Sequence, residues 1–480
     1  MSRLLVGPFN RAEGDLEVAL EIENGTVREA RVNAPLYRGF ERMLLGKSPL
    51  DALVIAPRIC GICSVAQSTA AALALAGCMG LEPTPNGRRV RNVVLAAESL
   101  LDHLTHFYLF FMPDFARPEY AGATWHDDVA GRFRAMTGSA RDEFLASRAA
   151  FLHLMGLLAG KWPHTLAIQP GGTTRSVTAA ERLRLLGIVR EFRRRLEGFL
   201  FGDDVEAVAT LDGAAALERW HDEGAGRGDL RRFLDLAAAG SLDGVGRSRL
   251  PLLSYGSYPD GEGLTFARGV WRDGAAAPLD VAAIAEDVSH SWSGTGEARV
   301  PADGRTAPDA DKGDAYSWCK APRLGGEPAE TGAFARQVIA GHPLAVDLAG
   351  QGGSNVRSRV VGRLLEAARL LQLIETWVGE IRPNEPFNAS GTLPDEGEGA
   401  GLVEAARGAL GHWLSVRDGR IANYQIVAPT TWNFSPRDAA GVPGPLEQAL
   451  AGTPSGDEDP SAGVFHVVRS FDPCMVCTVH

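Results

Sequence analysis

Two short stretches of the chain decide which fold and chemistry to expect: PRICGIC at residues 57–63 and DPCMVCTVH at residues 472–480. Each contains a CxxC pair, so four of the six cysteines lie in pairs near opposite ends of the chain, and the final residue is a histidine. Pairs that are far apart in sequence can converge in space, and four thiolates in one pocket suit a soft transition metal. The two stretches therefore predict a buried metal centre.

A structural zinc site and a redox-active dithiol are the two alternatives for these cysteines. Zinc ribbons usually bring their cysteine pairs together within a small module, whereas nearly the whole chain separates the pairs here. Neither pair is predicted to follow a strand in a βαβ unit, where a thioredoxin-like pair lies. Arg58 and His480 add a charged group and an imidazole beside the pairs. We therefore favour a centre other than these two.

Composition excludes several classes of function. The chain has 480 residues, of which 45% are hydrophobic, and 48 Lys+Arg against 59 Asp+Glu give a net charge of -11. This balance draws the protein neither to nucleic acid nor to an anionic membrane surface. Six cysteines are too few for a disulfide scaffold.

We find no signal peptide and no apolar run long enough for membrane insertion. We therefore expect a cytoplasmic protein, unless a partner that carries its own signal exports it.

Hydrophobic periodicity predicts an α+β fold that is predominantly helical. Apolar residues recur at helical spacing over four long segments, which predict a long-helix bundle as the core: residues 64–79, 92–111, 178–201 and 354–381. Alternating patterns around Asn24-Gly25 and Asp418-Gly419 predict peripheral β-hairpins at residues 16–32 and 413–427.

The chain is predicted to form a single integrated domain over residues 1–480. An N-terminal β-ribbon is expected at about residues 1–35, and a Gly-, Asp-, Pro- and Ala-rich stretch at about 258–312 predicts an irregular excursion from the core. Shorter loops are expected at residues 394–401 and 452–463. Because both CxxC pairs lie outside these stretches, we expect the two end regions of the chain to meet at the centre.

The motifs as a set resemble those of the large subunit of nickel-iron hydrogenases. The segments 58–63 and 472–480 are similar to the two signatures of that family, and further matches follow in the family's order: Glu13-Gly14, Arg38-Gly39-Phe40-Glu41, Asp102-His103, His106-Phe107-Tyr108, Tyr316-Ser317-Trp318, Lys320-Ala321-Pro322-Arg323, Ala406-Arg407-Gly408-Ala409-Leu410 and Pro429-Thr430-Thr431-Trp432-Asn433. The resemblance extends from end to end. It implies the hydrogenase large-subunit fold and reversible heterolytic cleavage of dihydrogen to protons and electrons.

The resemblance also implies the cofactor. All four cysteines would bind nickel, and Cys63 and Cys477 would in addition bridge to an iron that carries carbon monoxide and cyanide, with Cys60 and Cys474 as terminal ligands. Thiolates suit such a centre because they are soft and strongly donating. The remaining cysteines lie outside any ligand spacing, so no iron-sulfur cluster is expected in this chain.

Side chains around the centre receive roles from the same resemblance. Arg407 would lie over the open metal position with Asp102 as its carboxylate partner, and His103 would be a donor in the same network. Thr430 would donate a hydrogen bond to a cyanide. Glu13 would pass protons away from a bridging thiolate, which requires a carboxyl group close to the sulfur.

A magnesium site is the second metal site that the resemblance implies. Glu41 and His480 would be its side-chain ligands, a backbone carbonyl near Ile426 would be the third, and waters would complete an octahedron.

Several residues depart from the common pattern of the family. Gln67, next to the centre, and Asp15 stand where most catalytic members have histidine, so two titratable imidazoles are lost. Ile62 and Phe110 stand where Val and Leu commonly line the gas channel, and larger side chains would hinder oxygen more than dihydrogen. These departures resemble the regulatory, dihydrogen-sensing subgroup. Sensors are generally encoded without an extension beyond the terminal histidine, and we expect the same for His480.

The resemblance implies partners as well. Electrons must leave through an iron-sulfur small subunit in a heterodimer or a dimer of heterodimers, bound at an apolar interface near the first CxxC pair. A signalling histidine kinase would receive the signal of a sensor. The alternatives are an uptake hydrogenase large subunit of the related cyanobacterial type and a metal-free assembly or binding module, which the retained cysteines, Arg407 and Glu13 disfavour.

Overall fold

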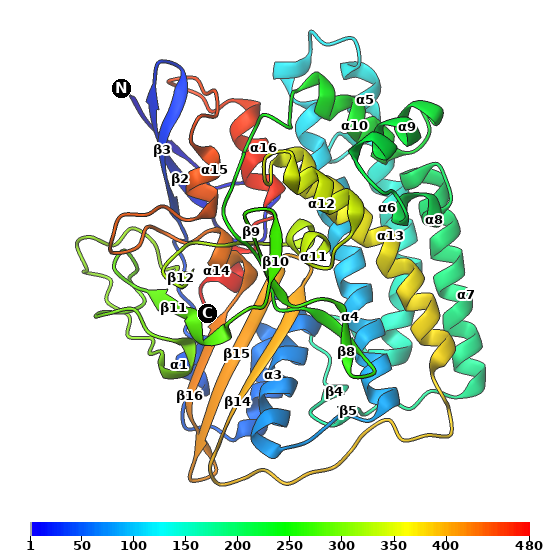
Figure 1. The fold of residues 1–480 in the computed structure, drawn as a ribbon, viewed down its shortest axis with the longest axis vertical. Helices are drawn as coiled ribbons and strands as arrows, with labels where there is room; N and C mark the ends of the chain where they lie inside the picture. The colour runs from blue at the N-terminus through cyan, green and yellow to red at the C-terminus, as the bar shows by residue number, and fades with distance from the viewer. Residues whose placement is uncertain (1) are drawn as a thin grey trace.

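A computed structural model describes residues 2–480. The first residue of the expected β-ribbon therefore lies outside the described residues. Figure 1 shows long helices packed along one side of the molecule and sheets on the other, which confirms the predicted α+β class with a helical core.

Long helices that pack on one another form the core of the fold. They are α3 (Ser64–Met79), α4 (Pro85–Thr105), α6 (Ser139–Ala159), α7 (Ala179–Leu196) and α13 (Val356–Glu380). α4 contacts α3, α6 and α13, while α7 contacts α6 and α13. Buried apolar side chains from these helices belong to one contiguous hydrophobic cluster, which supplies the main driving force for folding.

The predicted helices are confirmed, with differences at their ends. α3 has the predicted bounds, but α4 begins seven residues before the predicted start at Asn92. The reason is a local start signal: the Thr84 side chain accepts a hydrogen bond from the Gly87 N–H, and Pro85 occupies the first helical position. Beyond α4 the chain continues as a π-helix, His106–Phe111.

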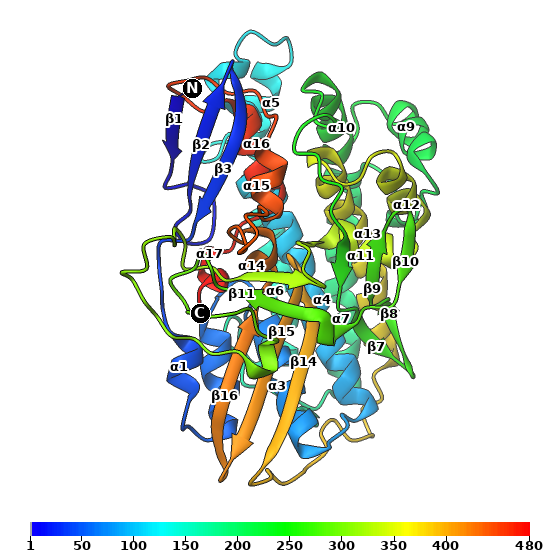
Figure 2. The ribbon, with the colours of Figure 1, turned by 60° about the vertical axis from the view of Figure 1, so that its left-hand side comes forward.

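The N-terminal hairpin is confirmed and has a third strand. β2 (Glu17–Glu23) and β3 (Thr26–Asn33) pair antiparallel around Asn24-Gly25, and both turn residues have positive φ. β1 (Ser2–Val6) adds to the outer edge of β2. Figure 2 shows this sheet at the periphery of the molecule, with the N-terminus at its edge.

The second hairpin also belongs to a three-stranded sheet, formed by β14 (Gly397–Ala405), β15 (Gly408–Arg417) and β16 (Arg420–Val427). The prediction of a loop at residues 394–401 is wrong, because β14 begins within it. Its glycines serve close packing against α3: a Cβ on Gly399 would lie 2.0 Å from the Ala74 carbonyl oxygen, and one on Gly401 would lie 1.8 Å from that of Ala70. Glycine here marks a close approach of backbones rather than a turn.

Short strands interrupt the stretch at 258–312 that was predicted to be irregular. β9 and β10 join β6 and β13 in one sheet, β11 pairs with β12, and β7 pairs with β8. Their bounds are β6 (Leu252–Ser254), β7 (Ser257–Asp260), β8 (Gly263–Phe266), β9 (Gly269–Arg272), β10 (Ala275–Ala277), β11 (Ile284–Asp287), β12 (Ala321–Leu324) and β13 (Glu330–Thr331). Each is too short to show a clear alternation in sequence.

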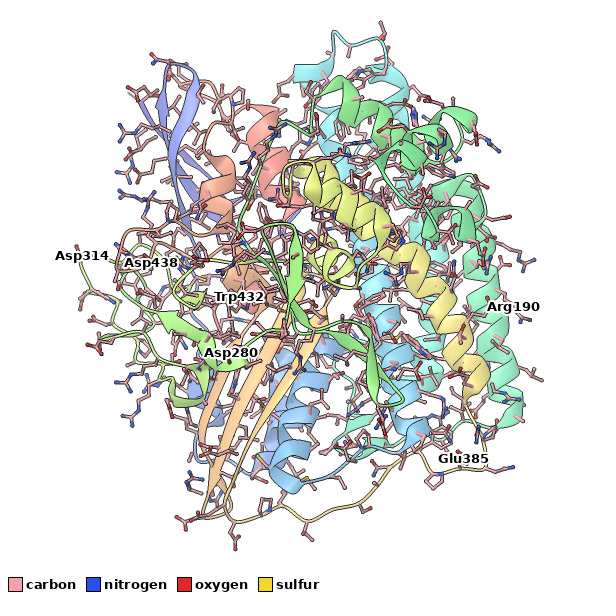
Figure 3. All side chains as sticks on the ribbon, in the orientation of Figure 1. Arg190, Asp280, Asp314, Glu385, Trp432 and Asp438 are labelled. Carbon is pink, nitrogen blue, oxygen red and sulfur yellow. The ribbon has the colours of Figure 1, made fainter. Side chains whose placement is uncertain are left out.

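The last part of the chain runs from the surface into the centre. Shorter helices along this path include α14 (Pro429–Asn433), α15 (Pro445–Leu450), α16 (Ala462–Ser470) and α17 (Met475–Thr478). Figure 3 shows Trp432 of α14 in the middle of the molecule and the charged side chains of Arg190 and Glu385 at its edge. Glu13 forms a parallel bridge with Cys474, so the two end regions of the chain do meet, although β1 itself lies at the edge.

The contact between α3 and β14 is expected to be essential for stability. Replacing Gly401 with alanine should lower the free energy of unfolding by about 2–3 kcal/mol, because the added Cβ forces the strand away from Ala70. Urea denaturation measures the effect. Gly187→Ala in α7 is the matched control, since its Cβ meets no atom within 4 Å, and it should gain about 0.5–1 kcal/mol. An unchanged unfolding midpoint for Gly401→Ala would contradict the close packing.

Candidate metal centre

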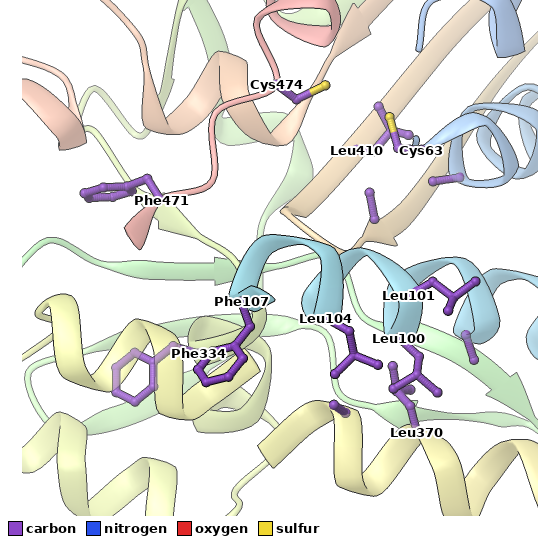
Figure 4. Packing of buried hydrophobic residues seen from close by; sticks show 14 of the residues in the cluster. Cys63, Leu100, Leu101, Leu104, Phe107, Phe334, Leu370, Leu410, Phe471 and Cys474 are labelled. Atoms are coloured by element: carbon purple, nitrogen blue, oxygen red, sulfur yellow. The ribbon is translucent and has the colours of Figure 1, made fainter. Parts of the chain in front are cut away.

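The two CxxC pairs converge on one buried site. Cys60 and Cys63 lie just before α3, whereas Cys474 precedes α17 and Cys477 lies within it. The Sγ atoms of Cys63 and Cys477 are 3.0 Å apart, those of Cys474 and Cys477 are 3.1 Å apart, and those of Cys60 and Cys474 are 3.5 Å apart. All four sulfurs lie within 4.8 Å of one another. Figure 4 shows Cys63 and Cys474 entering the same space above α4.

The thiols are free and their environment favours a bound cation. All four are buried and none forms a disulfide. Burial raises the pKa of the Cys474 and Cys477 thiols, whereas hydrogen bonds from the neighbouring thiols, that of Cys474 first, lower the pKa of Cys60. A buried cluster of this kind releases its protons when a cation takes their place. The donor set therefore fits a soft metal ion such as nickel.

Arg407 holds the cysteine segment to its surroundings. It lies in the turn between β14 and β15 and is buried. Its Nη2 donates to Asp472 Oδ1 at 3.0 Å, and its Nε donates to the Asp472 carbonyl oxygen at 3.1 Å. Its Nη1 is 2.8 Å from Asp102 Oδ2, an ion-pair distance, although the N–H does not point at that oxygen as in a hydrogen bond. Asp102 is thus a partner of Arg407 as expected, and Asp472 is a second partner that sequence reasoning missed.

Burial and the neighbouring arginines have opposite effects on the pKa values of Asp102 and Asp472. Burial raises the pKa of Asp102 to about 7, although Arg407 favours its ionised form. Burial also opposes ionisation of Asp472, but Arg407 and Arg363 outweigh it and lower the pKa. Asp472 lies two residues before Cys474 in the C-terminal motif, and that adjacency is the signal that could have identified it.

His103 lies in a different network from the one expected. Its Nε2 is 3.0 Å from Glu366 Oε1, and Glu366 is in turn bound by the Arg336 guanidinium. Among the described residues no hydrogen bond joins His103 to Arg407 or Asp102. The reason is helical geometry, because successive residues of α4 point about 100° apart. Burial lowers the pKa of His103 to about 4, so the imidazole is neutral near pH 7.

Polar groups surround the sulfurs. The Thr430 hydroxyl accepts a hydrogen bond from the Cys474 N–H at 3.3 Å, which leaves its own proton free to donate. The Gln67 amide nitrogen is 3.9 Å from Cys477 Sγ.

A chain of donors behind Gln67 was not anticipated from the sequence. His412 Nε2 is 2.8 Å from Gln67 Oε1, and His412 Nδ1 is 2.7 Å from the Tyr424 hydroxyl. Burial lowers the pKa of His412 to about 3, so its ring is neutral. Because an amide oxygen only accepts, Nε2–H must donate to Gln67 and Nδ1 must accept from Tyr424. This arrangement directs the Gln67 amide N–H groups towards Cys477.

Glu13 is placed beside the cysteines by its backbone. Its N–H donates to the Pro473 carbonyl oxygen at 3.3 Å, and its carbonyl oxygen accepts from the Met475 N–H at 2.6 Å. Burial, followed by the charge of Cys60, raises the pKa of the Glu13 carboxyl group. No hydrogen bond between this carboxyl group and a sulfur is present in the part of the chain that the structure describes.

The three expected magnesium ligands also converge. Glu41 Oε1 accepts from the Ile426 N–H at 2.9 Å and is 3.5 Å from His480 Nε2, which is 2.5 Å from the Ile426 carbonyl oxygen. Burial opposes ionisation of Glu41, but Lys320 and hydrogen bonds from His480 and Thr306 outweigh it and lower its pKa to about 2. A carboxylate, a carbonyl and an imidazole fit a small divalent cation.

Lys320 and Glu286 complete the surroundings of Glu41 and were not predicted. Lys320 Nζ is 3.4 Å from Glu41 Oε2 and 3.3 Å from Glu286 Oε2, and it donates to Gln425 at 2.8 Å. Glu286 Oε1 is buried and has no hydrogen-bond partner in the described residues, which leaves an acceptor for a metal-bound water.

The proposed gas-channel residues are half-buried. Ile62 packs against the main hydrophobic cluster next to Cys63, and the Phe110 backbone carbonyl accepts from Arg11. The channel stays a prediction. Among residues 2–480 no helix is both long and apolar enough to cross a membrane.

The chain is similar over its whole length to hydrogenase large subunits. The family described as nickel-dependent hydrogenase matches residues 38–124 and 142–480. The periplasmic NiFeSe hydrogenase large subunit of Desulfomicrobium baculatum is 30% identical, over 100% of this chain and 95% of that protein. The uptake hydrogenase large subunit of Rubrivivax gelatinosus is 26% identical, over the same shares. The reduced Ni-Fe-Se hydrogenase from D. vulgaris Hildenborough has a TM-score of 0.83 and 31% identity, with both chains covered at 100%.

Nickel binding is expected to depend on all four sulfurs. The Cys477→Ser variant should retain less than a tenth of the nickel of the unmodified protein, because a hydroxyl is a poor ligand for a soft metal. Elemental analysis of the purified proteins measures this. Cys78→Ser is the matched control, since Cys78 is half-buried and outside the cluster. Equal nickel content in the Cys477 variant and the control would contradict the assignment.

Proposed function

The chain belongs to the nickel-dependent hydrogenase family as a large subunit that acts on dihydrogen, and we propose that its four cysteines hold a nickel-iron centre. The observation that carries this proposal is the convergence of four free, buried sulfurs within 4.8 Å. In the proposed arrangement Cys63 and Cys477 would bind both metals, Cys60 and Cys474 would bind nickel alone, and the iron would carry carbon monoxide and cyanide. Thr430, whose proton is free, would donate to a cyanide.

Once bound, the metals would polarise dihydrogen and accept its two electrons. The remaining chemistry is the movement of two protons and belongs to the protein. Arg407, held by Asp472 and paired with Asp102, would place a fixed positive charge beside the thiolates. Such a charge stabilises the ionised thiolates and would provide a fixed electrostatic field on the side of the centre where dihydrogen binds.

Glu13 is proposed as the first proton acceptor. Burial raises the pKa of its carboxyl group, which brings the group closer to the pKa that transfer near neutral pH requires. Its backbone forms hydrogen bonds with Pro473 and Met475, so the residue is fixed beside the C-terminal CxxC pair. The carboxyl group would take a proton from a cysteine sulfur and pass it outwards.

A magnesium ion is proposed at Glu41, the Ile426 carbonyl and His480. The contacts between these groups support it, and Glu286 adds a second carboxyl group nearby, with Lys320 paired to both Glu41 and Glu286. The ion would anchor the end of the chain and hold Cys477 in place.

An iron-sulfur small subunit is the proposed partner, in a heterodimer or a dimer of heterodimers. Electrons need a path, and the cysteines outside the cluster, Cys78 and Cys319, are too few to bind an iron-sulfur cluster. Five large apolar side chains in the segment before the first CxxC pair are exposed: Leu36, Met43, Leu45, Leu50 and Val54. Exposed apolar surface favours a protein interface where it is contiguous.

The physiological role that we favour is that of a cytoplasmic dihydrogen sensor which signals through a histidine kinase. Gln67, fixed by His412, provides an amide donor where an imidazole would add a titratable group, and Ile62 and Phe110 are bulky. An uptake role is the second candidate, because relatives include a protein named as an uptake hydrogenase large subunit.

An experiment in the host cell distinguishes the two roles. If the chain is a sensor, replacing it with the Cys477→Ser variant should abolish the effect of dihydrogen on transcription, while other hydrogenases still consume the gas. Cys78→Ser should leave both responses unchanged. Loss of dihydrogen consumption with an intact transcriptional response would contradict the sensor role and support uptake.

Oxygen resistance is expected from the two bulky channel residues. The Ile62→Val/Phe110→Leu double variant should lose activity at least fivefold faster in air than the unmodified protein, because smaller side chains widen the path for oxygen. Dye reduction by dihydrogen, before and after exposure, measures this. Ile55→Val, at a half-buried position outside the CxxC pair, is the control. Equally rapid inactivation of all three proteins would contradict the channel proposal.

A further inference from the structure

A cavity of about 560 Å³ lies apart from the metal centre, between α3, α4, the β7–β8 hairpin and β14. Figure 1 shows these elements together in the lower half of the molecule. Within the described residues no cysteine contributes to the cavity wall. The cavity has the size of a binding site for a small organic molecule.

Arg91 of α4 lines the cavity as a buried charge without a partner. Only 4% of the residue is exposed, and its Nη1 has no hydrogen-bond partner among residues 2–480. Burial lowers the pKa of Arg91 to about 10, so it is still a cation at neutral pH. Glu82, the acid whose charge acts on it, is largely exposed and lies 3.8 Å from Arg88. Buried charges in native proteins are normally paired, so this guanidinium is available to pair with an anion in the cavity.

Two residues that line the cavity also have buried hydroxyl groups without a hydrogen-bond partner in the described chain. These groups are Thr69 Oγ1 on α3 and Ser257 Oγ on β7. Few buried polar groups in native structures are unpaired. Three residues that carry such groups, from three different elements, line one cavity. Each of them can donate a hydrogen bond to an oxygen acceptor.

Glu404, which also lines the cavity, does not form an ion pair with Arg91. Glu404 Oε1 accepts from the Tyr255 N–H at 2.6 Å, and Glu404 Oε2 accepts from Arg336 Nη1 at 2.8 Å. Both oxygens are therefore engaged by groups outside the cavity. Leucines at positions 73, 81, 95, 264 and 402 supply apolar surface on the wall, which also includes Glu82, Asn92, Tyr258 and Arg268.

We propose that this cavity binds an organic carboxylate with an apolar body. The carboxylate would pair with the Arg91 guanidinium and accept hydrogen bonds from the Thr69 and Ser257 hydroxyl groups. The apolar body of the ligand would pack against the leucines. A guanidinium matches a carboxylate with two parallel hydrogen bonds, which gives the head group its preference. No step of the dihydrogen chemistry uses this site, so the proposal goes beyond the proposed function.

Isothermal titration of the full-length protein, purified with its partners, tests the proposal with octanoate as the probe. We expect saturable binding of one octanoate per chain. Arg91→Met should weaken binding at least tenfold, because it removes the charge and keeps the length. Arg89→Met is the matched control on the same helix; Arg89 pairs with Glu380, does not line the cavity, and its replacement should leave binding unchanged. Octanol, which has the body without the charge, should bind at least tenfold more weakly than octanoate.

Thr69→Val keeps the shape of the wall and provides a second variant if Arg91→Met does not fold. It should weaken octanoate binding at least threefold. Nickel content, measured in parallel, reports whether each variant is folded around its metal centre. The proposal is overturned by absence of octanoate binding to the unmodified protein, by equal binding to the Arg91 and Arg89 variants, or by octanol binding as tightly as octanoate.

Discussion

A single buried guanidinium, that of Arg407, joins three segments of the chain around the four cysteines. It binds the carboxylate and the backbone carbonyl of Asp472 in the C-terminal segment and pairs with Asp102 of α4, while it belongs itself to the turn between β14 and β15. This tie helps to hold the C-terminal CxxC pair beside the first pair. A charge this deeply buried is stable only because it is paired, so the sheet, the helix and the last nine residues must assemble together.

The close packing of β14 on α3 serves the same end. The glycines of β14 let the strand approach the backbone of α3, which begins directly after Cys63, and this brings Arg407 and His412 to the metal side of the sheet. Buried polar chains then orient individual groups, as His412 does for Gln67. Hydrophobic burial provides most of the stability, whereas these paired polar groups select one arrangement of the site.

Short motifs in the sequence pointed to residues that the fold brings close together. The cysteines, Glu41 with His480, and Asp102 with Arg407 were all identified and all lie together. The long helices were predicted from periodicity, and α3 with the correct ends. Partners supplied by distant parts of the chain were missed. Tyr424 and His412 lie in adjacent strands and face Gln67 only after folding, His103 turns towards Glu366, and the glycines of β14 suggested a loop. Such features depend on which surfaces meet, and local patterns do not encode this.

The central claim is that the converging sulfurs hold nickel together with an iron that carries carbon monoxide and cyanide. Infrared spectroscopy of the purified protein tests it most directly, because metal-bound carbon monoxide and cyanide absorb where protein groups do not. We predict bands for both ligands that shift when dihydrogen is added and that are absent from the Cys477→Ser variant. Nickel-loaded protein that lacks these bands, or a Cys477→Ser variant that retains them, would contradict the account.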